Sequence, residues 1–432
     1  RGSYNAYYNI LQQCQSKLSY EKKTLQNLFE RVSVDATGGS SAPVVAVNAL
    51  NRLESSEELY YTTFEPKVVT GWSGNLKRYK LGSDGEILDK NDKSAVDANT
   101  GYFAKEATSI WSSEVDGNIV TKGGAASHLT LDRKVYTYLG GASKTIDDSL
   151  VNVNLSGVIV AATGMTPDIF DTELSGTDFL NMLKWASGIT TIDGVEVARQ
   201  EIEDPLHTQP IILNYGTSTN YNSTLFFGTN SGYLHAIDTY RDPSKNPKER
   251  FAYVPYELLP NINMYYSKKN EIGKTYGLDG PVSSLIFNQT DVDAGTPKRR
   301  FIVGSTDKAY LYLTMRRGGN INYAIDVTDR DTPKYLWQIS TASSGFEELG
   351  QTWSGMTPVF INPKAIGVDS TKKSIPVLVF GGGYDPEEDL TSESVRLGQS
   401  TGNAIFIVDA MTGALLWKAS STLAADLTIS QM

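Results

Sequence analysis

The pattern of hydrophobic positions divides the chain into a helical start and a long region of strands. Over residues 4–32, apolar and Tyr side chains recur at steps of three and four, with Gln, Lys and Glu between them, which is the spacing of an amphipathic helix. A Gly- and Ser-rich segment at 36–43 breaks this pattern. From residue 44 onward, apolar residues alternate or form short runs, as strands do. We therefore expect an N-terminal helix and linker over 1–43 and a mainly β domain over 44–432.

One helical stretch interrupts the strand pattern. Residues 178–185 read Asp-Phe-Leu-Asn-Met-Leu-Lys-Trp, with Thr177 or Asp178 placed to cap the start and Gly188 to end the helix. The region 103–203 is therefore predicted to be either one strand unit with a long insertion or a small inserted subdomain. After Pro205, predicted strands follow in close succession to residue 418.

A hairpin unit recurs along this strand region. Its clearest copy covers residues 402–417, where strand formers lead into Asp409, a Thr-Gly turn and a second strand; looser copies contain Asp326, followed by Trp337, and Asp238. The Asp side chain can bond the backbone of its own turn, and Gly supplies the residue with positive φ. A unit repeated at wide intervals in a chain with 38 Gly and 24 Tyr predicts a β-propeller.

This interpretation makes two local predictions. The side chains of Trp337 and Trp417 should be buried between neighbouring repeats, because an indole fills the space against the next sheet. The carboxylates of Asp326 and Asp409 should accept hydrogen bonds from their own turns.

Composition and charge narrow the classes of protein that fit. The formal net charge is −10 and the pI is about 5.0, which argues against nucleic acid as a partner, since phosphate binding needs clustered Lys and Arg. The sequence contains no 18-residue apolar run, so no direct membrane span is predicted. Cys14 is the single cysteine, which excludes an intrachain disulfide. Because Met432 follows soon after the last hairpin, we expect a fragment of a longer protein, truncated at its C-terminus.

Several segments resemble a known family when they are taken together, in their order and spacing. They are Gly71-Trp-Ser-Gly-Asn-Leu-Lys-Arg-Tyr79, Gly123-Gly-Ala-Ala126 with Arg133-Lys-Val-Tyr-Thr-Tyr138, Phe227-Gly-Thr-Asn-Ser-Gly-Tyr-Leu-His-Ala-Ile-Asp238, Phe251-Ala-Tyr-Val-Pro255, Tyr323-Ala-Ile-Asp-Val-Thr-Asp329, Leu349-Gly-Gln-Thr-Trp-Ser354 and Gly381-Gly-Gly-Tyr-Asp385. The set resembles the C-terminal propeller of the PilY/PilC family, the type IV pilus tip-associated adhesins. The resemblance covers nearly everything from residue 44 to residue 417.

The resemblance implies a modified propeller of quinoprotein-dehydrogenase-like type that carries out no redox chemistry. No catalytic residue, no cofactor-binding residue and no pyrroloquinoline quinone are then expected. The implied function is that of a non-enzymatic type IV pilus tip and biogenesis factor and adhesin, which supports pilus assembly or retraction control, twitching motility, surface attachment and virulence. The implied partners are minor pilins or pilus-tip components and a host or surface receptor. The implied location is extracellular, at the pilus tip or the outer-membrane surface of a Gram-negative bacterium.

Two other functions fit the same propeller. An active quinone-dependent dehydrogenase is one, because residues 407–417 have the form of that family's blade-docking motif. Against it, the single cysteine removes the vicinal Cys pair of many such enzymes, and only one repeat fits the motif well. A scaffold for outer-membrane assembly is the other. For the adhesin, we expect contacts through 103–203 and through the loops 240–249 and 385–401, because loops on a rigid scaffold carry recognition.

Acidic residues offer one candidate metal site. Asp385, Glu387 and Asp389 lie close together in a loop, and carboxylate oxygens are the ligands that Ca²⁺ prefers. The loop lacks the alternate spacing and the central Gly of an EF-type loop, so a solvated loop is the competing interpretation. The calcium loop of the PilY/PilC family is expected downstream of Met432. Asp291 and Asp293 begin a second, weaker candidate, for which a turn is the alternative.

The remaining polar motifs favour structural roles. His128, His207 and His235 are far apart, without ligand spacing, and His235 lies inside a predicted strand, where a hydrogen-bonded core imidazole is expected. The cluster Gly381-Gly-Gly383 follows an apolar run and is interpreted as a change from strand to turn.

Overall fold

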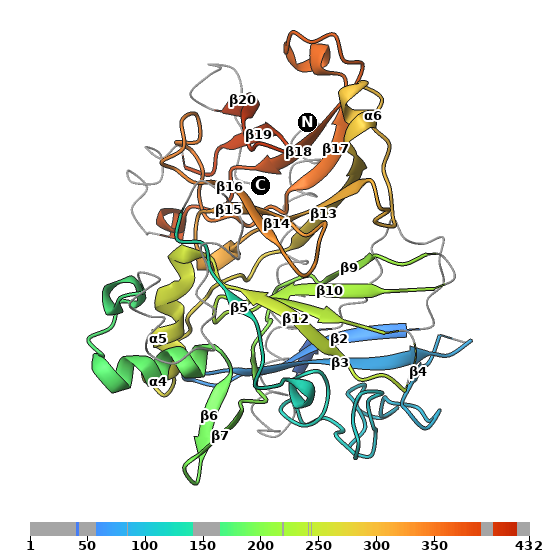
Figure 1. The fold of residues 1–432 in the computed structure, drawn as a ribbon, viewed down its shortest axis with the longest axis vertical. Helices are drawn as coiled ribbons and strands as arrows, with labels where there is room; N and C mark the ends of the chain where they lie inside the picture. The colour runs from blue at the N-terminus through green and yellow to red at the C-terminus, as the bar shows by residue number, and fades with distance from the viewer. Residues whose placement is uncertain are drawn as a thin grey trace, which may run out of the picture.

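A computed structural model describes residues 40–42, 58–83, 85–140, 165–217, 220–240, 242, 244–389 and 401–420. The predicted helix over 4–32, Cys14, and residues 44–57 and 141–164 of the predicted β domain lie outside the described residues. Within them the chain is mainly β, as predicted (Figure 1).

Four sheets, built mainly of antiparallel strands, and one two-stranded ribbon make up the β structure of the described residues. The first sheet has the order β1 (Ser40–Ala42), β2 (Glu58–Glu65), β3 (Ser73–Leu81), β4 (Ile87–Leu88), with β8 (Ile202–Glu203) also paired to β3. The second has the order β5 (Val135–Tyr136), β12 (Lys248–Tyr253), β11 (Leu234–Asp238), β10 (Ser223–Gly228), β9 (Ile211–Asn214). The third contains β13 (Val282–Asn288), β14 (Asp307–Leu313), β15 (Asn322–Asp326) and β16 (Lys334–Ile339). The fourth contains β17 (Thr357–Ile361), β18 (Ile375–Gly381), β19 (Ala404–Asp409) and β20 (Leu415–Ser420).

Three of these sheets are built the same way. Each is formed by four consecutive strands in chain order, β9–β12, β13–β16 and β17–β20, and the second sheet adds β5 in parallel to β12. The third strand of each has an irregular register just before the Asp of the predicted repeat, at Ala236/Ile237, Ala324/Ile325 and Ile407/Val408. The first strands of neighbouring sheets are in contact, β9 with β13 and β13 with β17, and the second strand β10 also contacts β13. The sheets follow one another in chain order (Figure 1).

The Asp side chains of the repeat behave as predicted. Asp326 Oδ1 accepts a 2.8 Å hydrogen bond from the backbone N–H of Thr328. Asp409 Oδ1 accepts from the N–H groups of Met411 and Thr412, each at 2.9 Å. In the third copy, Asp238 accepts instead from the Thr224 hydroxyl at 2.7 Å. The first two copies therefore cap their own turns, whereas the third anchors the neighbouring strand.

The two Trp side chains of the repeat differ. Trp337 is 7% exposed and packs in a cluster between the third and fourth sheets, where a Cβ on Gly413 would lie 2.8 Å from its ring. This prediction is confirmed. Trp417 is 37% exposed, so the prediction that it is buried was wrong. The reason is its place on β20, the last strand that the structure describes, with no further described sheet to cover it.

Short helices complete the fold. They are α4 (Gly176–Ala186), α5 (Leu259–Ser267) and α6 (Gln289–Asp293), with 3-10 turns η1 (Ala126–His128), η2 (Pro167–Phe170), η3 (Tyr256–Leu258), η4 (Arg316–Gly318), η5 (Pro363–Ile366) and η6 (Pro386–Asp389). The helix predicted at 178–185 is α4, and the backbone turns away at Gly188 with φ of +85°. In α4, Phe179, Met182 and Leu183 are buried in the largest apolar cluster, together with residues of α5 and of the second and third sheets.

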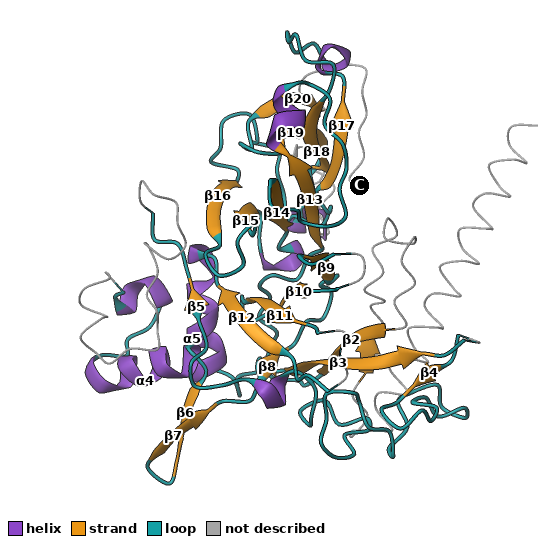
Figure 2. Cartoon of the chain, turned by 45° about the vertical axis from the view of Figure 1, so that its right-hand side comes forward, coloured by secondary structure: helices purple, strands orange, loops and turns teal. Residues whose placement is uncertain are grey.

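The region 103–203, predicted as an insertion, contributes strands to the first and second sheets. Its β5 pairs with β12 and its β8 pairs with β3, while the ribbon β6 (Ile189–Ile192) and β7 (Val195–Ala198) pairs within itself. Figure 2 shows this ribbon projecting from the body beside α4. None of the described sheets is a closed barrel, and whether the sheets form a propeller stays a prediction. None of the described helices is long and apolar enough to cross a membrane.

Candidate functional site

Two segments far apart in the sequence pair through their backbones and begin the candidate site. The N–H of Thr70 donates to the Glu271 carbonyl at 3.0 Å, and the N–H of Gly71 donates to the Lys269 carbonyl at 2.8 Å. The pairing is close: a Cβ on Gly71 would lie 2.9 Å from the Lys269 Cβ, so Gly is required here. We call residues 67–71 and 269–273 the paired segments.

Trp72 follows the first paired segment. Its indole N–H donates to the Lys67 carbonyl at 2.6 Å, its ring stacks on Phe64 with centroids 6.2 Å apart, and the Lys274 ammonium lies 4.5 Å from the ring centroid. Lys274 also donates to Asp204 Oδ2 at 2.5 Å. The indole is therefore fixed by a hydrogen bond and by a cation that is itself held in place.

Asp204 lies beneath this arrangement and is fully buried. Its carboxylate accepts hydrogen bonds from the Asn230 amide at 2.6 Å and from the Tyr265 hydroxyl at 3.1 Å, besides the Lys274 ammonium. Burial raises the pKa of Asp204 to about 6, although Lys274 acts in the opposite direction. Burial likewise lowers the pKa of Lys274, and Asp204 offsets part of this shift.

A second indole comes from the end of α4. The Arg199 guanidinium lies 4.0 Å from the centroid of Trp185 and donates to Glu203 Oε1 at 2.6 Å. Burial lowers the pKa of Arg199, but the charge of Glu203 raises it above its usual value. Burial alone would raise the pKa of Glu203, and Arg199 lowers it below the usual range. This ion pair therefore stays charged and holds Trp185 at the surface.

The two indoles line one pocket of about 280 Å³. Its walls come from the first paired segment and the start of β3, the loop before β8, the C-terminal ends of α4 and α5, and residues of the 121–126 turn. The lining residues are Lys67, Val69, Gly71, Trp72, Ser73, Gly74, Thr121, Ala126, Trp185, Gln200, Glu201, Ile202, Glu203, Tyr265, Lys269 and Asn270. Aromatic walls with exposed amide, carboxylate and ammonium groups can hold an apolar group and fix its polar neighbours.

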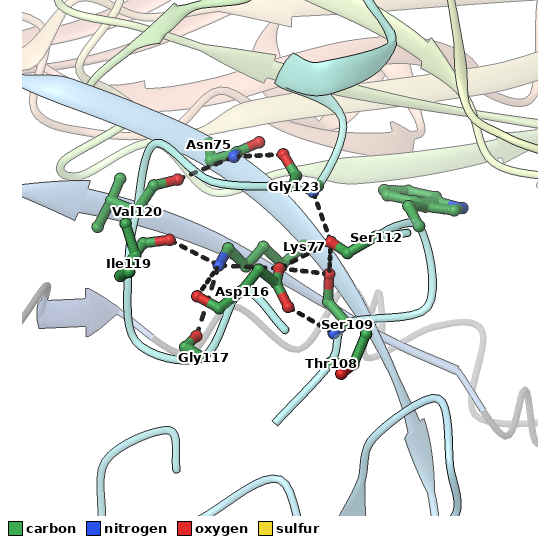
Figure 3. Close-up of polar contacts among 12 residues, drawn as sticks. Asn75, Lys77, Thr108, Ser109, Ser112, Asp116, Gly117, Ile119, Val120 and Gly123 are labelled. Atoms are coloured by element: carbon green, nitrogen blue, oxygen red, sulfur yellow. Dashed lines mark hydrogen bonds and ion pairs between the residues drawn. The ribbon is translucent and has the colours of Figure 1, made fainter. Parts of the chain in front are cut away.

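A buried lysine lies further along β3, beyond the residues that line the pocket. The side chains of Lys77 and Asp116 are 2% and 0% exposed, and Lys77 Nζ lies 3.0 Å from Asp116 Oδ2. Lys77 also donates to the Ile119 carbonyl at 2.8 Å, as Figure 3 shows. Burial lowers the pKa of Lys77, and Asp116 offsets part of the shift. The pair joins β3 to the long loop that follows β4.

Polar groups on both sides complete this network (Figure 3). Asp116 accepts 2.8 Å hydrogen bonds from the Ser109 backbone N–H and from the Ser109 and Ser112 hydroxyls. Asn75 donates to the carbonyls of Val120 and Gly123, each at 2.9 Å. Two segments of the PilY/PilC resemblance, 71–79 and 123–126, thus meet in a structural network, because all these polar groups are paired rather than presented to a ligand.

Another buried cluster contains His235. Its Nδ1 lies 2.7 Å from Glu249 Oε1, and Arg133 Nε donates to Glu249 Oε2 at 2.5 Å. Burial would raise the pKa of Glu249, but Arg133 and His235 lower it to about 2. The prediction of a core imidazole is confirmed, with Glu249 as its partner. His207 pairs with Asp279 at 2.7 Å and His128 with the Trp111 carbonyl at 2.7 Å.

The predicted metal residues lie partly in the short η6 turn. Asp385 is 4% exposed, and its Oδ1 accepts from the Glu387 N–H at 2.9 Å. Glu387 and Asp389 belong to η6. Among the described residues, no group of three or more His, Cys, Asp or Glu side chains is placed to hold a metal ion. Since residues 390–400 lie outside the described part, the calcium site stays a prediction.

The weaker acidic candidate and the glycine cluster have structural roles. Asp291 and Asp293 lie in α6, which joins β13 to β14, and Asp291 pairs with Arg300 at 2.9 Å. Strand β18 ends at Gly381, and Gly383, with φ of +92°, lies in the turn that follows, so the predicted change from strand to turn is confirmed. A Cβ there would lie 2.1 Å from the Gln351 carbonyl oxygen.

Sequence reasoning missed the pocket. Its residues come from segments near 70, 121, 185, 201 and 267, and no local spacing connects them. A signal was present only for the buried Lys77, which does not line the pocket: Asn75, Lys77 and Tyr79 alternate along β3, so period two places Lys77 on the same face as a buried Tyr.

Comparison with known proteins found relatives of one kind, while no protein-family model matches the chain. The chain is 32% identical over 130 residues to the type IV pilus biogenesis factor PilY1 homolog of Xylella fastidiosa. These 130 aligned residues are 30% of this chain and 9% of the relative. It is 22% identical over 385 residues to the type IV pilus biogenesis factor PilY1 of Pseudomonas aeruginosa, strain PAK. This alignment covers 84% of this chain and 27% of the relative.

A solved structure was also found. The C-terminal domain of Pseudomonas aeruginosa PilY1 matches with 22% identity and a TM-score of 0.30, over 49% of this chain and 32% of that chain. The chain thus spans 9% and 27% of the length of the two curated relatives. In agreement with the PilY/PilC resemblance, the sequence is PilY1-like over most of this chain.

Proposed function

We propose that this chain is part of a type IV pilus biogenesis factor and serves there as a non-enzymatic scaffold. The observation that carries the proposal is its similarity to PilY1 over 84% of the chain. The buried charged groups agree with a structural role, because Lys77, Arg199 and Glu249 are each neutralised by a partner within hydrogen-bonding distance.

We further propose that the four-stranded sheets are blades of a modified propeller. Three consecutive meanders share one strand order and one position of irregular register. Trp337 packs against the Thr-Gly turn of the next sheet at Gly413, as a residue that docks neighbouring blades would. This repetition supports the propeller-type architecture expected from the sequence.

In this proposal the protein is extracellular, at the pilus tip or outer-membrane surface, and acts as an adhesin that also supports twitching motility. Its partners are minor pilins or other pilus-tip components and a host or surface receptor. The projecting ribbon and the loops 240–249 and 385–401 are the proposed contacts, since loops on a rigid scaffold carry recognition.

An in-frame deletion of the encoding gene in its source bacterium tests the function. We expect fewer surface pili in the sheared fraction, unchanged pilin in whole cells, and recovery when the gene is restored. Unchanged surface pili and unchanged twitching would refute the proposal.

A quinone-dependent dehydrogenase remains the second candidate. Its blade-docking motif requires an Asp that caps its own turn, and Asp409 forms this cap. The purified chain should be incubated with pyrroloquinoline quinone, Ca²⁺ and an artificial electron acceptor over a panel of alcohols and sugars. Turnover would favour the enzyme, whereas we expect none above a heat-denatured control.

A further inference from the structure

Two adjacent arginines lie where loops of the third and fourth sheets meet. Arg316 and Arg317 belong to the η4 turn between β14 and β15. The backbone N–H of Arg316 donates to the Thr352 carbonyl, just before β17, at 3.1 Å. A Cβ on Gly318 would clash with the Gly277 carbonyl, just before β13. The two guanidinium groups are therefore carried by a turn that is packed between two other segments.

The backbone of Arg316 adopts an unfavourable conformation. Its φ is +50°, in the left-handed region, which residues other than Gly, Asn and Asp seldom occupy. The other non-Gly residues with positive φ in the described chain are all Asp, at positions 92, 171 and 193. Strain of this kind is often found at ligand-binding positions, where the surrounding structure fixes a side chain.

Aromatic rings hold both guanidinium groups in place. The guanidinium carbons of Arg316 and Arg317 lie 4.3 Å and 5.4 Å from the ring centroid of Trp353. The Arg317 guanidinium also lies 5.6 Å from the centroid of Tyr276 and donates to its hydroxyl at 3.2 Å. Trp353 is itself fixed, because its indole N–H donates to Gln351 Oε1 at 3.1 Å. One indole thus keeps two cations side by side.

Neither guanidinium forms an ion pair with a described residue. The acidic η6 turn follows Tyr384, whose ring centroid lies 5.3 Å from that of Trp353, yet none of its carboxylates pairs with either arginine. Burial lowers the pKa of Arg316, and Asp279 offsets part of this shift. The Asp279 carboxylate is buried and already paired with His207 Nδ1 at 2.7 Å. The positive charge of the two arginines is therefore not neutralised locally.

The donors of Arg316 are also unused. Its Nε is buried without a hydrogen-bond partner, whereas its terminal N–H groups are not buried and form no hydrogen bond with a described residue. A buried donor without an acceptor costs free energy, and two neighbouring cations repel each other. The fold thus holds a guanidinium group at a cost and leaves its outer N–H groups accessible. Such a group matches an oxyanion, because its two parallel N–H groups fit two oxygen atoms.

We propose that Arg316 and Arg317 bind an oxyanion, a carboxylate, phosphate or sulfate group of a ligand, through the N–H groups of their guanidinium groups beside Trp353. The site goes beyond the proposed function and does not depend on it. The chain as a whole has a formal net charge of −10, so its overall field repels anions. Binding at this place must therefore come from the local pair of arginines.

Isothermal titration calorimetry of the purified full chain tests the site, with sodium phosphate, sodium sulfate and trisodium citrate titrated separately at constant ionic strength. We expect at least one of these anions to bind at one site per chain, and the strongest identifies the group. Its affinity should fall at least about tenfold in R316M/R317M. R316K/R317K keeps both charges but not the paired N–H groups, and it should also bind more weakly than the wild type.

A second basic pair provides the matched control. Lys298 and Arg299 are both exposed, so K298M/R299M removes the same charge elsewhere and should bind like the wild type. Circular dichroism shows whether each variant is folded. R316G gives an independent test, because Gly suits a φ of +50° and the variant removes one guanidinium group without adding strain; it should also weaken binding.

The proposal is overturned if none of the three anions binds, or if the wild type and R316M/R317M bind alike. An equal loss in K298M/R299M would overturn it too, because overall charge would then explain the binding. Wild-type affinity in R316K/R317K would overturn recognition by the paired N–H groups. None of these results bears on pilus assembly, so the gene deletion tests the proposed function separately.

Discussion

Replacing Lys77 by Met should destabilise the fold strongly, because it removes a charge from a fully buried ion pair and keeps most of the alkyl chain. The partner Asp116 would remain with its hydrogen bonds from Ser109 and Ser112 but without a cation, at 0% exposure. Breaking a buried pair in this way costs about 3–5 kcal/mol. The loop 104–124 should lose protection first, because Lys77 bonds its carbonyls.

A matched control lies on the same strand. Lys80 pairs with Asp92 at 2.5 Å, but their side chains are 32% and 71% exposed, so Lys80→Met should cost at most about 1 kcal/mol. The double variant K77M/D116N should recover part of the loss from K77M, since neither buried charge remains. This recovery separates the charge effect from lost packing.

Urea unfolding followed by fluorescence gives the midpoints, and hydrogen exchange with mass spectrometry gives the protection of residues 104–124. The reasoning would be refuted if K77M and K80M shifted the midpoint equally. It would also be refuted if exchange in 104–124 did not change in K77M, because the pair would then not hold the loop.

Other predictions follow from the same structure. Burial raises the pKa of Asp204 from 3.8 to about 6, so the folded state binds this proton more tightly than the unfolded state does; the resulting stabilisation is full below about pH 3.8 and is lost as the pH rises through about 6. The wild type should therefore lose about 3 kcal/mol of stability as the pH rises through this range, and Asp204→Asn should not. Urea midpoints measured across the range test this, and the same pH dependence in both proteins would contradict the raised pKa of Asp204. Trp337→Ala should cost about 3–5 kcal/mol, and Trp417→Ala, at an exposed site, should cost clearly less; equal shifts in thermal unfolding would disprove packing between the sheets. Calorimetric Ca²⁺ titration should give weak binding that D385A/D389A abolishes, and equal heats from both proteins would remove this loop as a calcium site.

Local chemistry explains which parts of the fold could be predicted. The α4 helix has an apolar face at helical spacing, and its end at Gly188 was readable because Gly accepts positive φ. The caps of Asp326 and Asp409 were predictable because the donor and acceptor lie within three residues of each other. Such features depend on neighbours in the sequence.

Contacts between distant segments explain the rest. Lys77 is an unusual core residue, and its burial depends on Asp116 and on a loop whose course the sequence does not show. Trp417 has the same local pattern as Trp337, yet its exposure is decided by the next sheet. The pocket depends on helix ends and loops brought together by the fold, so its residues carry no common spacing.

Immunogold electron microscopy of the source bacterium, with antibodies raised against the purified chain, tests the central claim most directly. If the chain belongs to a type IV pilus biogenesis factor, gold should label pili or the cell surface at their base, and the label should disappear in the deletion strain. Label confined to the cell interior, with pili unlabelled and normal in number after deletion, would contradict the account.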